Sequence, residues 1–77
     1  MPDGGRKLRN LRSNQVIRAF ERIGYSVVRI KGSHFILRHP DHGMIVLPVH
    51  RDAIKAGIIM DALKKARISI EEFEALL

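Results

Sequence analysis

Six residues that could do chemistry at a phosphate fall within one short stretch of this chain. They are Arg29, Lys31, Gly32, Ser33, His34 and Arg38. An imidazole gains and loses a proton near neutral pH, so His34 is a candidate general acid or base. Cationic side chains, backbone N–H groups and a serine hydroxyl all donate hydrogen bonds to phosphate oxygens. The stretch therefore predicts acid–base chemistry on an anionic substrate.

The candidate site lies where two strand-like runs meet. Residues 25–31 and 33–39 are rich in the β-branched and aromatic side chains that are typical of strands. Gly32 between them favours a tight turn, because a glycine adopts a positive φ at little cost. The chain is therefore expected to reverse direction immediately before His34.

Alternation along the two strands predicts which side chains face outward. On the second strand, Phe35 and Leu37 are expected to face the core. His34, Ile36 and Arg38 would then face outward. On the first strand, the same pattern predicts that Val28 and Ile30 face the core. It predicts that Val27, Arg29 and Lys31 face outward. The exposed face would then carry several cations beside one imidazole.

The elements around these strands are predicted from periodicity and turn residues. Apolar residues at helical spacing predict a helix that is capped by Ser13 or Asn14 and ends at Gly24. Turn-forming residues at 40–43 lead to a third strand over residues 44–49. Three strands with two short connections predict an antiparallel meander.

Two helices are predicted after the sheet. A helical pattern of apolar residues starts at Gly57, and Ser69 with Glu72 has the spacing of a capping box that opens a short last helix. The order α-β-β-β-α-α predicts an α+β fold, with a three-stranded antiparallel sheet and the helices packed on one face. The opposite face stays open to solvent or to a ligand.

Charge is distributed unevenly along the 77 residues, whose formal net charge is +6. Residues 1–38 hold nine lysines and arginines against two acids, whereas residues 39–77 hold five against six. This asymmetry favours a polyanionic partner, with nucleic acid or an acidic protein as the leading alternatives. Residues 1–12 are predicted to form a flexible basic arm, and residues 13–77 the folded domain.

Several classes of protein are disfavoured by composition. Without cysteine, the chain has neither disulfides nor a thiolate metal site. No apolar run resembles a signal peptide or a membrane span, so a cytoplasmic protein is expected. The four histidines do not have the spacing of a zinc motif, so no metal or cofactor is predicted. His39 and His42 are expected at the surface.

Several separate motifs resemble those of the HicA-like (YcfA) family of small toxins. The resemblance runs from about Asn14 to Leu77. It is carried by Glu-Arg-Ile-Gly-Tyr at 21–25, Arg-Ile-Lys-Gly-Ser-His at 29–34, His-Pro at 39–40, Leu-Pro-Val-His at 47–50 and Ala-Gly at 56–57. Gly-Ser-His alone would be a weak motif, but its order and spacing with the other pieces make the match specific.

The resemblance implies a fold like that of a double-stranded-RNA-binding domain and the activity of an mRNA-cleaving toxin that a HicB-type antitoxin silences. It implies a metal-independent endoribonuclease in which His34 is the catalytic histidine. RNA cleavage of this kind needs a base, cationic donors for the phosphorane and an acid for the leaving oxygen. His50 is a candidate for the second proton carrier. The RNA-binding residues would be Arg29, Lys31, Gly32, Ser33 and Arg38.

Two other functions remain as alternatives. The first is an RNA-binding module of the same fold without activity, and the second is a basic domain that binds an acidic protein. A homo-oligomer is a further alternative to a single chain. Cleavage of RNA in the presence of a chelator distinguishes the endoribonuclease from both alternatives.

Overall fold

Six elements follow one another in the computed structural model, which describes residues 8, 10–49 and 53–77. They are helix α2 (Ser13–Arg22), strands β1 (Ser26–Lys31), β2 (His34–His39) and β3 (Gly43–Pro48), and helices α3 (Ala56–Ala66) and α4 (Ile70–Glu74). The strands form one antiparallel sheet in the order β1-β2-β3. The predicted α+β order and the meander are confirmed, and the arrangement is like that of a double-stranded-RNA-binding domain.

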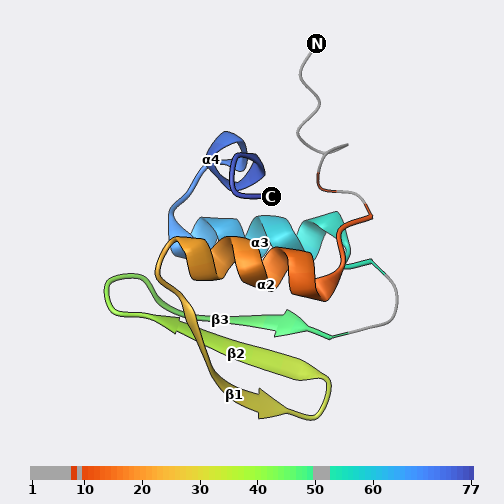
Figure 1. Ribbon diagram of the computed structural model, residues 1–77, viewed down its shortest axis with the longest axis vertical. Helices are drawn as coiled ribbons and strands as arrows, with labels where there is room; N and C mark the ends of the chain where they lie inside the picture. The colour runs from red at the N-terminus through yellow and green to blue at the C-terminus, as the bar shows by residue number, and fades with distance from the viewer. Residues whose placement is uncertain (1–7, 9, 50–52) are drawn as a thin grey trace.

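The helices cover one side of the sheet, nearest to β3. In Figure 1, α2 and α3 lie side by side next to β3, and β1 is the strand farthest from them. α3 packs mainly against β3, and α2 also contacts that strand. The side chains that fill the space between them are apolar and fully buried, and they include Val16, Phe20, Leu37, Ile45, Leu47 and Ile59. The other face of the sheet stays open, as predicted.

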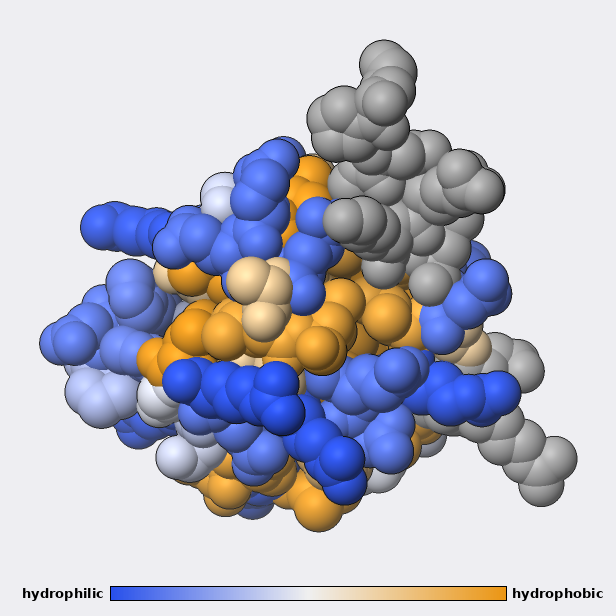
Figure 2. Space-filling view, turned by 45° about the horizontal axis from the view of Figure 1, so that its top comes forward, coloured by the Kyte–Doolittle hydropathy of each residue, from blue (hydrophilic) through white to orange (hydrophobic). Residues whose placement is uncertain are grey.

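The short helix α4 lies against α2. Phe73 of α4 is fully buried, and its ring centroid lies 5.3 Å from that of Phe20. The Arg22 guanidinium at the end of α2 donates a hydrogen bond to the carbonyl of Leu76. Seen from the helical side, hydrophobic side chains form a band across the middle of the molecule, with hydrophilic side chains on both sides (Figure 2).

The start of the domain contributes to the core. The predicted basic arm lies largely outside the described residues, but Leu8 and Leu11 are both buried in the main apolar cluster. The N–H of Ile54 donates to the carbonyl of Leu11 at 2.8 Å. This bond joins the segment before α2 to the segment before α3.

The cap predicted for α2 is wrong. The N-cap is Arg12, whose backbone N–H donates to the side-chain oxygen of Gln15 at 2.9 Å. Ser13 is instead the first helical residue, it is buried, and its hydroxyl donates to the carbonyl of Pro48 at 3.0 Å. Ser13 therefore joins α2 to the end of β3, a long-range contact that overrides its local tendency to cap.

The predicted faces of β1 are also wrong in part, because the strand contains a β-bulge. Val27 lies opposite Leu37, but Arg29 lies opposite Ile36, so Val28 is an extra residue that breaks the alternation. Val27 packs against the core, whereas Val28 is 55% exposed. After the bulge the alternation is as predicted, but Val27 and Val28 face the sides opposite to those predicted for them.

Ile30 lies on the predicted side of the sheet but is not buried. It is paired with Phe35, which packs against the core, and residues directly opposite in a sheet share a face. Even so, 60% of Ile30 is exposed. The helices pack nearer to β3, so they do not reach this end of β1.

The predicted helix ends are confirmed at two places. Gly24 follows the C-cap of α2 with a φ of +108°. At α4, the N–H of Glu72 donates to the Ser69 hydroxyl at 3.0 Å, and the N–H of Ser69 donates to a Glu72 carboxylate oxygen at 2.9 Å. This is the capping box expected from the sequence, and its hydrogen bonds hold the pKa of Glu72 below the usual value.

Candidate active site

The candidate site begins at the turn between β1 and β2. Gly32 has a φ of +57°, which is the conformation that its position between two strands predicted. The N–H of Val49, directly after β3, donates to the carbonyl of Ser33 at 2.6 Å. The turn is therefore held by a neighbouring strand, and His34 begins β2 from a fixed position.

The pairing of β1 with β2 places Lys31 beside His34. The two residues are directly opposite, so their side chains share a face with Cβ atoms about 5 Å apart. Arg29 is two residues before Lys31 and lies diagonally across from His34, at about 7–8 Å. An ammonium and a guanidinium thus neighbour the imidazole on the open face, as predicted.

Arg38 lies on the same face but at the other end of β2. It is four positions after His34, which corresponds to about 13 Å along a strand. Ser26 is its partner across β1. The structure therefore places Arg38 farther from the imidazole along the sheet than Lys31 and Arg29.

A shallow depression of about 620 Å³ surrounds His34 on the open face. Its lining comes from the β1–β2 turn and from the middle of the sheet, and consists of Lys31, Gly32, Ser33, His34, Ile36 and Val46. Ile36 and Val46 are directly opposite each other on β2 and β3 and form its apolar part. The depression thus combines cationic and hydroxyl groups with an apolar surface.

His34 is exposed within this depression. In the ranges that the structure describes, no group forms a hydrogen bond with its ring, so both ring nitrogens are accessible to a ligand. A proton carrier needs this accessibility, because it must come within hydrogen-bond reach of the substrate atom.

His39 has a different environment, because it is part-buried and its ring is engaged within the fold. Its Nε2 lies 2.9 Å from the carbonyl of Ile23, and its Nδ1 accepts from the N–H groups of Asp41 at 2.9 Å and His42 at 3.3 Å. A carbonyl can only accept, so Nε2 carries the proton. His39 is part-buried and joins the end of α2 to the β2–β3 turn.

The rings beside His39 form a small cluster under that turn. The centroid of His39 lies 4.5 Å from that of His42 and 5.0 Å from that of Tyr25. His42 is also partly buried. Burial raises the pKa of the Tyr25 hydroxyl. This cluster holds the fold together and lies at the far end of β2 from His34.

The last histidine, His50, lies outside the described residues, so its predicted part as second proton carrier stays a prediction. Within the described residues, no group of three or more histidine, aspartate or glutamate side chains is placed to hold a metal ion. No helix in the same part of the chain has the length and hydrophobicity to span a bilayer.

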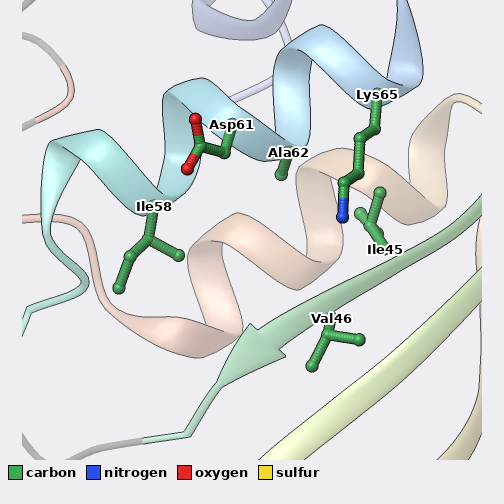
Figure 3. Close-up of a pocket in the computed structure, with 6 residues that line it drawn as sticks. All are labelled: Ile45, Val46, Ile58, Asp61, Ala62 and Lys65. Atoms are coloured by element: carbon green, nitrogen blue, oxygen red, sulfur yellow. The ribbon is translucent and has the colours of Figure 1, made fainter.

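A second hollow, between β3 and α3, was not predicted from the sequence. A hollow of about 190 Å³ lies between β3 and α3, lined by Ile45, Val46, Ile58, Asp61, Ala62 and Lys65 (Figure 3). Nothing along the sequence links these residues, because they belong to two elements that are separated by residues 49–55. In the sequence Ile58 is one more apolar residue of the α3 pattern, and only the structure shows that it is exposed.

A comparison of the chain with known protein families gives a match. Residues 13–68 match the family model described as the HicA toxin of bacterial toxin-antitoxin systems. A search of curated proteins gives no match. The matched range contains the whole sheet, the β1–β2 turn with His34, and helices α2 and α3.

Proposed function

The chain belongs to the HicA toxin family and is thus the toxin of a toxin-antitoxin pair, and we propose that it acts by cutting messenger RNA with His34. The observation that carries this proposal is the placement of an exposed imidazole beside Lys31 in a depression open to solvent. Neither His39 nor His42 has such a position, because both are engaged beneath the β2–β3 turn.

The reaction proposed is transesterification followed by release of the two RNA ends. A base removes the proton of a ribose 2′-hydroxyl, and that oxygen attacks the adjacent phosphorus. The bond from phosphorus to the 5′-oxygen breaks, and an acid protonates the leaving oxygen. The products are a 2′,3′-cyclic phosphate and a 5′-hydroxyl. His34 supplies one of the two proton transfers, and His50 is the residue predicted for the other.

Lys31 is the residue proposed to stabilise the charge that develops on the phosphorane. It is the cation directly opposite His34, so a phosphate that meets the imidazole also lies within reach of the ammonium. Gly32 and Ser33 line the same depression, and their backbone N–H groups and the Ser33 hydroxyl are proposed as further donors. Donors already held in place stabilise such charge without reorganisation during the reaction.

Arg29 and Arg38 are proposed to bind RNA away from the scissile bond. Together with Lys31 they form a row of cations along the open face, from the turn to the far end of β2. Because Arg38 is about 13 Å from His34 along the strand, it would contact a neighbouring phosphate. Contacts of this kind increase affinity and are weakened by salt.

The partners proposed are RNA and a HicB-type antitoxin that silences the toxin, in the cytoplasm. An acidic antitoxin surface would complement the chain's net charge of +6. The cations of the open face would be the part of the toxin most attractive to either partner.

An analysis of product ends tests the proposed chemistry. Purified protein is incubated with an end-labelled RNA and a chelator, and the fragments are examined for 2′,3′-cyclic phosphates. We expect cyclic ends, and no cleavage at a nucleotide whose 2′-hydroxyl is replaced by hydrogen. Cleavage at such 2′-deoxy positions would contradict the mechanism. Salt-dependent binding without products would instead indicate a binding module, and absence of RNA binding a protein-interaction domain.

A further inference from the structure

The outer edge of β3 carries backbone groups that no described residue uses. The N–H of Val49 bonds to Ser33, so the hydrogen-bonded pairs of β2 and β3 fall on every second residue from there. Ile45 and Leu47 therefore bond to β2, while Met44 and Val46 direct their N–H and C=O groups away from it. The next outward carbonyl, that of Pro48, accepts from Ser13.

These outward groups border the hollow between β3 and α3. Figure 3 shows Ile45 and Val46 on the strand side, with Ile58, Asp61 and Lys65 on the helix side. Val46 is 47% exposed and Ile58 36% exposed. The volume of about 190 Å³ is of the size that accepts one apolar group, since a cavity of about 150 Å³ holds benzene.

Two charges of opposite sign stand at this hollow without pairing to each other. Asp61 and Lys65 have the i, i+4 spacing that favours an ion pair on a helix, but the described residues contain no ion pair between them. Figure 3 shows the Lys65 ammonium extending toward Ile45, while the Asp61 carboxylate points away on the side of Ile58. The Lys65 ammonium is therefore available to a ligand in the hollow.

The β1 edge of the sheet is protected, whereas the β3 edge is protected only at Pro48, which has no backbone N–H. β1 has a bulge at Val28 and the cations Arg29 and Lys31, and both features discourage pairing with another strand. The register of β3 is regular along its whole length. An edge strand beside a helix, with an apolar hollow between them, is the arrangement in which peptide-binding domains add an extended segment to their sheet.

We propose that an extended segment of the antitoxin adds as a fourth strand along Met44 and Val46, in the groove between β3 and α3. One of its apolar side chains fills the hollow, and an acidic residue pairs with Lys65. The inference rests on the antitoxin partner of the proposed function and is independent of the cleavage chemistry.

The net charge of the chain favours an acidic partner over a second copy of the toxin. Pairing two identical β3 edges would bring together two molecules that each carry a formal charge of +6, and like charges oppose association. An acidic segment does not meet this repulsion, Lys65 offers it a counter-charge at the groove, and its strand pairing satisfies the outward backbone groups. The experiment must therefore distinguish antitoxin binding at this edge from dimerisation of the toxin.

A strand at this edge would lie next to the candidate active site. Val46 lines both the hollow and the depression around His34. The added strand would extend the open face beyond β3, so antitoxin side chains on that face would border the entrance to His34. Binding at the edge could thus restrict RNA access without contact to the imidazole.

Hydrogen exchange of the toxin in complex with its full-length cognate antitoxin tests the proposal. We expect the amides of Met44 and Val46 to exchange at least tenfold more slowly in the complex than in the free toxin. The matched control is the amide of Ile30, which faces outward on the β1 edge by the same alternation and should change less than twofold. Unchanged rates at Met44 and Val46 in a formed complex would overturn the proposal.

A pair of charge reversals tests the groove separately. Lys64 and Lys65 are adjacent exposed lysines of α3, but only Lys65 lines the hollow. We expect Lys65→Glu to weaken antitoxin binding at least tenfold and Lys64→Glu less than twofold. Equal losses of antitoxin affinity in the two variants would indicate general electrostatic attraction and overturn the proposal. Slowed exchange of Met44 and Val46 in a toxin dimer without antitoxin would also overturn it. RNA cleavage is not read in either experiment, so failure of the cleavage proposal would be seen separately.

Discussion

The ring of His39 occupies the space beside Gly24 that any other residue would need. A Cβ at Gly24 would lie 2.8 Å from Nε2 of His39, and φ at Gly24 is +108°. The same nitrogen donates to the carbonyl of Ile23, so the contact and the hydrogen bond fix one ring in one place. The end of α2 and the end of β2 are held together by this relationship.

Gly24→Ala is therefore expected to destabilise the protein by at least about 2 kcal/mol, from backbone strain and the displaced ring. Urea denaturation measures the loss. Gly57→Ala is the matched control, because no atom lies within 4 Å of a Cβ built there and the site is helical. That variant should be as stable as the parent or more stable, by up to about 1 kcal/mol. Equal stability of the two variants would contradict the account of Gly24.

Tyr25→Phe tests the cost of a buried hydroxyl. The Tyr25 hydroxyl has no hydrogen-bond partner among the described residues, although the ring is almost fully buried. Removing a hydroxyl that lacks a partner should leave stability unchanged or raise it by about 1 kcal/mol. A loss of more than about 1 kcal/mol would show that the hydroxyl has a partner after all.

The same residue predicts how stability changes at high pH. Burial raises the pKa of Tyr25 in the folded protein, so above about pH 10 the unfolded chain loses this proton first. The free energy of unfolding should then fall as pH rises through this range. In denaturation series at pH 9 to 11, the free energy of unfolding of Tyr25→Phe should fall less steeply than that of the parent. Parallel curves for the two proteins would contradict the assignment.

The open face shows what alternation can predict and where it fails. The side on which Arg29, Lys31, His34 and Arg38 lie follows from period-2 alternation, and the structure confirms it. The bulge could not be predicted, because Val27 and Val28 are both apolar and either could face the core. Which of two adjacent valines is extra depends on how β1 pairs with β2, and that is a property of the sheet.

Long-range hydrogen bonds explain the other differences. Ser13 has the right type and place for a cap, yet its hydroxyl binds Pro48, which is 35 residues away. His39 looks like a turn residue in the sequence, but its ring is held by α2. Neither partner could be identified before the fold was known, whereas the capping box at Ser69 is local and was predictable.

Lys31→Ala and Arg38→Ala should separate catalysis from binding. Lys31 lies opposite His34, so its loss should lower kcat by about 10²-fold or more, as for other groups that stabilise developing charge. Arg38 lies farther along β2, so its loss should act mainly on KM and reduce the slope of log affinity against log salt by about 0.7. Steady-state cleavage and binding titrations at several salt concentrations measure both. The same kinetic effect for both variants would contradict the difference in position.

The most direct test of the central claim compares RNA cleavage by the parent protein and by His34→Ala, with a chelator present and thermal unfolding measured in parallel. Because His34 is exposed and makes no hydrogen bond within the described residues, we expect His34→Ala to unfold at the same temperature. His39→Ala should behave in the opposite way, with lower stability but retained cleavage per folded molecule. The account predicts a loss of cleavage of at least about 10²-fold for His34→Ala. Cleavage by that variant at the parental rate would contradict it.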